Sequence, residues 1–426
     1  MCPVGWLAGA SARPTSEAKT LSLGVPIFPP FPKHRARHEK RLEFQGDAAL
    51  GEGAIRLLRV AGHPGAAVVH RSAQRRPVAG YRRPGSLLGQ VAPLSLALGF
   101  ALAALPPATD GGLAQLESLL AAPLAKDGGG VVRVTQLDQV LFERAYGGYR
   151  LDDAVPLASG TQLLSTVVLL ELVDARKLSL DTRVASVLHD WPLDKAAVTL
   201  RMLLAHTSGL PTSTPCLDDR DTTLEVCVQQ IAGTPLRKDP GSAVIYGGTG
   251  FQVAGRMAEV VSGKSWAELF REGLTQPLGL RATGFGRTAN PRIAGGAQSS
   301  AEDYGAVLDL LLQGGTRRGV RLLTPDLVEA MFQDQSGGAP LVHSPYALFA
   351  GREASRPGLG VWLERTDGHG RGLEAVCQGI FGFTAWMDRE RRLGGVLLVH
   401  GDLRRTVPLE QELRAWFRQA VAPNQH

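Results

Sequence analysis

The chain has 426 residues, of which 44% are hydrophobic and 20% are charged, with 51 Gly and 27 Pro. This composition excludes collagen-like, disulfide-dense and wholly disordered proteins, and the length suits two packed domains or one large α/β domain. The formal charge of +6 is unevenly placed: residues 1–90 hold 14 basic and 5 acidic residues, whereas residues 91–426 hold 32 and 35. Because the larger part of the chain is slightly acidic, we expect no nucleic-acid partner.

Residues 1–80 are predicted to form a non-globular extension. Prolines and basic clusters interrupt this stretch, and no helical or strand period continues for long. No methionine stands between Met1 and Met202. Our hypothesis is that translation starts at a non-ATG codon near Val78, so that residues 1–77 do not belong to the natural protein.

Residues 81–108 have the pattern of a secretory signal peptide. A basic start at Tyr81-Arg82-Arg83 is followed by the uncharged apolar run Leu94–Leu105, which ends in small residues. A bilayer needs about 20 apolar residues, so we expect no stable membrane span and a mature protein in the periplasm or outside the cell. The alternative is that this run forms a buried helix of the core.

The rest of the chain predicts strands at both ends with helices between them. In chain order the patterns predict a hairpin over Val131–Tyr146, helices over Ser159–Asp174, Leu200–Ala205, Phe251–Val261 and Trp266–Leu274, strands over Gly360–Arg365, Glu374–Val376, Thr384–Asp388 and Gly395–His400, and a helix over Val407–Ala420. This order predicts an α/β fold over residues 109–421, in which helices flank an antiparallel sheet. The sheet part covers about 109–158 and 290–421, and a mostly helical insertion covers about 159–289.

Cys216 and Cys227 bracket a short polar loop. An oxidising compartment would favour a disulfide between them, and the alternative is two unrelated small apolar side chains. No further Cys or His stands nearby at the spacing of a zinc site, so we expect no metal.

Residues 258–265 match a nucleotide-binding P-loop loosely. That site needs a preceding strand and a glycine where Ala258 stands, whereas the segment before it is an amphipathic helix. Gly263 is better interpreted as the C-terminal cap of this helix, and we expect no nucleotide and no other cofactor.

Ser159 lies where an irregular segment enters the first buried helix. Backbone N–H groups without partners and the positive end of the helix dipole would favour negative charge beside its hydroxyl. The alternative is an N-cap serine, which is common at helix starts.

The sequence around Ser159 resembles the serine β-lactamase and penicillin-binding-protein superfamily, in particular its class C-like branch of esterases and D-alanyl-peptidases. The resemblance is carried by residues 157–162, 169–181, 199–210 with its His-Thr-Ser-Gly-Leu segment, 246–255 and 276–280. It implies that Ser159 is the nucleophile and Tyr246 the second proton-transfer group. It also places Cys377-Gln378-Gly379 on the opposite wall of the cleft.

Three positions depart from the pattern of that family. Gln162 stands where the Ser-x-x-Lys motif has lysine, Gly248 ends the Tyr-x-Asn element, and Cys377 replaces a basic or hydroxyl residue. We expect Gln162, Gly248 and residues 377–379 to contact substrate. An amide can neither take up a proton near neutral pH nor lower the pKa of a neighbouring tyrosine by its charge.

Two functions remain open at this stage. The first is an exported serine hydrolase that transfers the acyl group of an ester, a β-lactam or a D-alanyl peptide through a Ser159 acyl-enzyme. The second is a catalytically inactive relative that binds a cell-wall peptide or a partner protein.

Overall fold

The computed structural model describes residues 110–344 and 355–423. The predictions for residues 1–80 and 81–108 lie outside these ranges. Within the described ranges, no helix is both long and apolar enough to cross a bilayer.

One seven-stranded antiparallel sheet forms the centre of the described chain. Its strands are β1 (Gly129–Gln136), β2 (Gln139–Gly147), β9 (Arg356–Pro357), β10 (Trp362–Thr366), β11 (Gly372–Gln378), β12 (Thr384–Asp388) and β13 (Leu393–Leu398). They follow the order β2-β1-β13-β12-β11-β10-β9, so that the first hairpin pairs with the last strand. Both ends of the described chain therefore build the same sheet.

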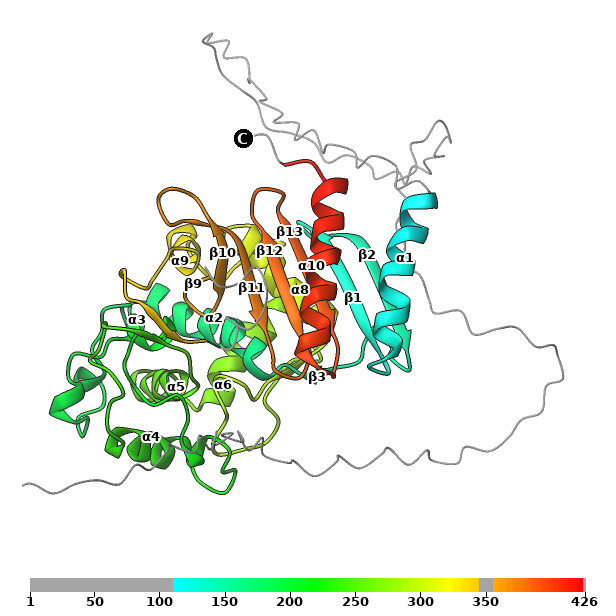
Figure 1. The fold of residues 1–426 in the computed structure, drawn as a ribbon. Helices are drawn as coiled ribbons and strands as arrows, with labels where there is room; N and C mark the ends of the chain where they lie inside the picture. Colours follow the sequence, from blue (N-terminus) through cyan, green and yellow to red (C-terminus); the bar gives the residue numbers. More distant parts are fainter. Residues whose placement is uncertain (1–109, 345–354, 424–426) are drawn as a thin grey trace, which may run out of the picture. The chain divides into compact units, whose positions relative to one another are not determined.

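Helices cover both faces of this sheet. On one face α1 (Asp110–Ala125) and α10 (Leu403–Ala420) lie side by side (Figure 1), and on the other face α2 (Thr161–Asp174) and α8 (Ala301–Leu312) pack. The side chains of β1 alternate between two apolar cores: Val132 and Val134 join the core under α1 and α10, and Val131 joins the larger core around α2. The prediction of an antiparallel sheet flanked by helices is confirmed.

The remaining elements lie between β2 and β9 in the chain. They are β3 (Val155–Pro156), α3 (Leu200–Leu204), α4 (Leu224–Gly233), β4 (Val244–Ile245), α5 (Thr249–Ser262), α6 (Trp266–Phe270), α7 (Gln276–Leu278), β5 (Gln298–Ser299), β6 (Thr316–Arg317), β7 (Val320–Arg321), α9 (Pro325–Met331) and β8 (Leu341–His343). Gly263 caps α5 in the left-handed conformation, with φ of 70°. This geometry agrees with a helix cap and not with a phosphate-binding loop.

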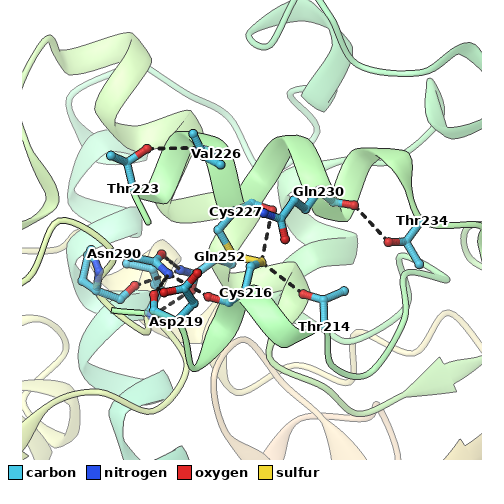
Figure 2. Close-up of a disulfide and its surroundings, with 12 residues drawn as sticks. Thr214, Cys216, Asp219, Thr223, Val226, Cys227, Gln230, Thr234, Gln252 and Asn290 are labelled. Atoms are coloured by element: carbon cyan, nitrogen blue, oxygen red, sulfur yellow. Dashed lines mark hydrogen bonds between the residues drawn. A yellow bond between two sulfur atoms is a disulfide. The ribbon is translucent and has the colours of Figure 1, made fainter. Parts of the chain in front are cut away.

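A disulfide joins Cys216 to Cys227 and ties the loop before α4 to that helix (Figure 2). Asn290 supports the loop from outside, since its Nδ2 donates to the carbonyl oxygens of Cys216 and Asp219 at 2.7 and 2.8 Å. Gln252 of α5 donates in turn to Oδ1 of Asn290 at 2.8 Å. The loop is thus held by one covalent bond and a chain of amide hydrogen bonds.

Candidate active site

Ser159 lies in a short 3₁₀ turn, Ala158–Gly160, and not at the N-cap of the helix that follows. The predicted helix Ser159–Asp174 begins two residues later, at Thr161, and its N-cap residue Gly160 makes no side-chain capping bond. The N-cap interpretation of Ser159 is therefore wrong. The half-buried hydroxyl lies one residue before the cap, close to the positive end of α2.

The residue before Ser159 is held in a strained conformation. Ala158 has φ of 44°, in the left-handed region that non-glycine residues adopt at a cost of about 1 kcal/mol. Such strain persists only where the surrounding structure determines it, and it is often found at functional sites.

Contacts from distant parts of the chain determine this turn. The hydroxyl of Tyr304 donates to the carbonyl oxygen of Gly160 at 2.9 Å. A Cβ on Gly160 would lie 2.5 Å from the ring of Phe383, and one on Gly379 would lie 2.0 Å from the carbonyl oxygen of Leu157. The turn and the end of β11 therefore approach so closely that only glycine fits at both contact points.

Two backbone N–H groups at this contact are free to bind a ligand. Among the described residues, neither the N–H of Ser159 nor that of Ile380, which follows Gly379, donates a hydrogen bond. They belong to the two segments that Gly379 brings into contact. An oxygen that becomes negative during acyl transfer is stabilised by such a pair of donors.

Gln162 is buried on α2, and its amide contacts the side chains of Tyr246 and His206. Its Nε2 donates to the hydroxyl oxygen of Tyr246 at 2.9 Å, and its Oε1 lies 3.3 Å from Nε2 of His206. The structure thus brings together Gln162 and Tyr246, which are 84 residues apart. Only 5% of the Gln162 surface is exposed, and its amide contacts Tyr246 and His206; that it also contacts substrate stays a prediction.

His206 is the member of this site that the sequence did not single out for a role. It is buried, and burial lowers the pKa of the imidazole to about 3, so the ring is neutral at physiological pH. Its ring packs 4.6 Å from the ring of Tyr246 and is stacked at 6.2 Å on that of Trp362. Neither of the polar groups bonded to Gln162 therefore supplies the positive charge that a lysine would bring.

Backbone contacts fix the segment that carries Tyr246. The N–H of Tyr246 donates to the carbonyl oxygen of His343, and the N–H of Gly248 donates to that of Thr212, both at 2.9 Å. A Cβ on Gly247 would lie 2.5 Å from the backbone of Thr212. Gly248 is the N-cap residue of α5 and is half-buried, so it offers backbone but no side chain to the site.

The side chains of Cys377 and Gln378 do not reach the surface of the cleft. Their exposed fractions are 4% and 1%, and burial raises the pKa of the Cys377 thiol to about 12. The expectation that these side chains contact substrate is corrected, because strand β11 turns both into packed surroundings. A ligand can meet this segment only through the backbone near Gly379, and a thiol of that pKa is no nucleophile.

The site has no candidate metal centre. No group of three or more His, Cys, Asp and Glu side chains in the described parts of the chain is placed to hold an ion. The chemistry available within it comes from a hydroxyl, two N–H donors and a phenol bonded to an amide.

Comparison with known proteins shows which family this chain belongs to. The family model described as Beta-lactamase matches residues 116–415. The chain belongs to the Beta-lactamase family. Its relatives include penicillin-binding protein 4 of Amycolatopsis lactamdurans, 34% identical over 30% of this chain, and lovastatin esterase of Penicillium rubens, 26% identical over 63% of it. The matches span 35% and 84% of those proteins.

Solved structures of other proteins share the fold. A protein of Bacteroides dorei, assigned as a beta-lactamase, is 28% identical with a TM-score of 0.65, and the match covers 71% of this chain and 97% of that one. EstCE1, described as a hydrolase with promiscuous acyltransferase activity, has a TM-score of 0.60 at 20% identity, with 71% and 98% covered. The second likeness concerns the fold alone.

Proposed function

We propose that this protein is a slow serine acyl hydrolase that reacts through Ser159. The observation that carries the proposal is the preserved turn: a half-buried hydroxyl beside the N-terminus of α2, with the free N–H groups of Ser159 and Ile380 at the same contact. This arrangement favours attack on a carbonyl, because it stabilises the oxyanion without any charged side chain.

Tyr246 is the proposed proton-transfer group. Its oxygen accepts one hydrogen bond from Gln162, and a phenol can both take up a proton on its oxygen and give up its own. As the Ser159 oxygen bonds to the carbonyl carbon, its proton passes to Tyr246 and the phenol proton passes to the departing atom. Water then cleaves the acyl-serine ester by the same route in reverse.

The absence of a lysine at position 162 makes the proposed reaction slow. A neutral amide donor stabilises charge developing on the phenol oxygen less than an ammonium group does, since hydrogen bonds to charged partners are about twice as strong. The loss of a general base typically costs about 10² to 10⁴ in rate. We therefore expect acylation to be measurable with activated acyl compounds and weak with unactivated ones.

The proposed substrates are an ester, a β-lactam or a D-alanyl peptide. The support is kinship with a penicillin-binding protein and with lovastatin esterase. A second candidate is an inactive protein that uses the same cleft to bind a cell-wall peptide or a partner protein. What favours it is the neutral, fully bonded amide at position 162.

We also propose that the protein is exported. The signal-like pattern of residues 81–108 supports this, and so does the disulfide between Cys216 and Cys227, a bond that persists mainly in oxidising compartments. N-terminal peptide analysis of the natural product tests it: a mature terminus near Ala104 is expected, and peptides from residues 1–77 would contradict it.

Covalent labelling tests the hydrolase proposal directly. The full chain is incubated with a fluorophosphonate probe or a labelled penicillin, and the modified peptide is found by mass spectrometry. We expect an adduct on Ser159 that is absent from Ser159→Ala. An unlabelled protein, or equal labelling of both, would favour the inactive binding protein.

A further inference from the structure

We propose that His206 is a positioning residue that fixes the amide of Gln162 so that its N–H, and not its carbonyl oxygen, faces Tyr246. The role rests on the proposed acyl transfer, but the arrangement of the three side chains can be tested separately. The observation behind it is the continuous chain of two hydrogen bonds from His206 through Gln162 to Tyr246.

The two hydrogen bonds constrain each other. An amide offers a donor on one side and an acceptor on the other. Because Nε2 of Gln162 donates to Tyr246, its Oε1 must accept from His206, so Nε2 of His206 must carry the proton. Since burial keeps this imidazole neutral, its Nδ1 is then without a proton.

The opposite arrangement is also a complete network. If the proton of His206 moved to Nδ1, Nε2 would become an acceptor and the amide would rotate to offer it an N–H. The carbonyl oxygen of Gln162 would then face Tyr246 and accept its O–H. The tautomer of the buried His206 ring therefore selects between two hydrogen-bonding states of the Tyr246 phenol.

Only one of these states serves the proposed reaction. With the N–H of Gln162 facing it, the oxygen of Tyr246 accepts a bond that stabilises negative charge on it. With the carbonyl oxygen facing it, the O–H of Tyr246 is engaged and the phenol oxygen loses that stabilising donor. His206 thus acts on the reaction through Gln162 and touches neither Ser159 nor substrate.

Neighbouring aromatic rings and a backbone hydrogen bond hold the imidazole of His206 in position. The ring of His206 packs against those of Tyr246 and Trp362, which also contact each other at 5.9 Å, and Phe251 lies 5.7 Å away. The carbonyl oxygen of His206 accepts from the N–H of Ile245, the residue before Tyr246. The imidazole and the phenol are therefore carried by backbone segments that are bonded to each other.

Nitrogen NMR of the full chain with ¹⁵N-labelled histidine tests the arrangement without any need for activity. The signals of residue 206 are assigned by their loss in a His206→Gln variant. We expect a neutral imidazole that carries its one N–H proton on Nε2 between pH 5 and 8. The Nδ1–H tautomer, or an imidazolium in that range, would overturn the proposal even if Ser159 reacts with the probe.

Two matched variants separate positioning from packing. His206→Gln retains an N–H that can donate to Gln162 but loses the ring, whereas His206→Phe retains a ring of similar size but loses the donor. We expect His206→Phe to lower the rate of Ser159 labelling about fivefold or more, and His206→Gln to retain most of it, at matched melting temperatures.

The opposite ranking, with Phe retaining the rate and Gln losing it, would show that His206 serves only to pack. If the wild-type chain is not labelled at all, the proposed function fails, and the NMR result still decides whether His206 orients the amide.

Discussion

The two halves of the site, the turn around Ser159 and the cluster around Gln162, differ in the groups that define them. The turn around Ser159 is set by backbone and packing: a left-handed Ala158, two glycines without room for a Cβ, and two free N–H groups. The cluster of Gln162, Tyr246 and His206 is set by side chains, and all its polar contacts are between neutral groups. The first half thus offers two N–H groups as candidate donors to an oxyanion, whereas the second half has no charged group.

The two steps of the proposed acyl transfer, oxyanion binding and proton transfer, thus depend on separate parts of the chain. Oxyanion binding needs only the close approach of β11 to the turn, which the fold supplies. The proposed proton transfer depends on the chemistry of one side chain on α2, that of Gln162, which bonds to Tyr246. The first two of the following experiments each concern one half, and the third concerns a feature outside both.

The largest effect is expected from Gly379→Ala. The new Cβ would lie 2.0 Å from the carbonyl oxygen of Leu157 and would force β11 away from the turn. We expect the free energy of unfolding to fall by about 1 to 3 kcal/mol and Ser159 labelling to fall by about 10² or more. Gly284→Ala is the matched control, because no atom lies within 4 Å of the Cβ it adds. Normal labelling of Gly379→Ala would show that this contact does not form the oxyanion site.

The second effect is a loss of folding stability at low pH, which arises from the buried neutral imidazole of His206. The folded chain holds the pKa of His206 near 3, whereas the unfolded chain has the ordinary value of 6.5. Between these values the unfolded state binds the extra proton, so stability falls as the pH falls, by about 3 kcal/mol between pH 7 and 4. Urea unfolding at several pH values measures it. His206→Phe should lose this share of the pH dependence, and an unchanged slope would contradict a neutral buried imidazole.

The smallest effect is expected from opening the disulfide, which touches neither half. Reduction of Cys216–Cys227 releases a loop of only 11 residues in sequence separation, so we expect a loss of about 2 kcal/mol in the free energy of unfolding. Denaturant unfolding with and without reductant measures this. The rate of Ser159 labelling should be the same in both, and a large change would show that the loop before α4 shapes the site.

The sequence predicts regular elements well where the signal is local. Strand β12 has the predicted bounds, Thr384–Asp388, and Gly263 caps α5 as its position after an amphipathic run indicates. Helices α1, α4 and α8 were not predicted, although Ser300 and the acidic Glu302 and Asp303 give α8 a typical helix start.

The candidate site was predictable in part. The family pattern pointed to Ser159, Gln162 and Tyr246, and the structure joins the last two by a hydrogen bond. The 3₁₀ turn was beyond prediction, because Gly379 and Phe383 impose it from more than 200 residues away. The partnership of His206 with Gln162 was hidden for the same reason, and burial of Cys377 and Gln378 follows from strand pairing that no local pattern reveals.

We propose that this protein has an acyl-binding turn beside a proton relay weakened at residue 162. The most direct test is the second-order rate constant for fluorophosphonate labelling of Ser159 in the wild-type chain and in Gln162→Lys, with Ser159→Ala as the blank. The account predicts slow but specific labelling of the wild type and a rate about 10² to 10⁴ higher in Gln162→Lys. A folded Gln162→Lys variant that reacts no faster than the wild type would contradict it.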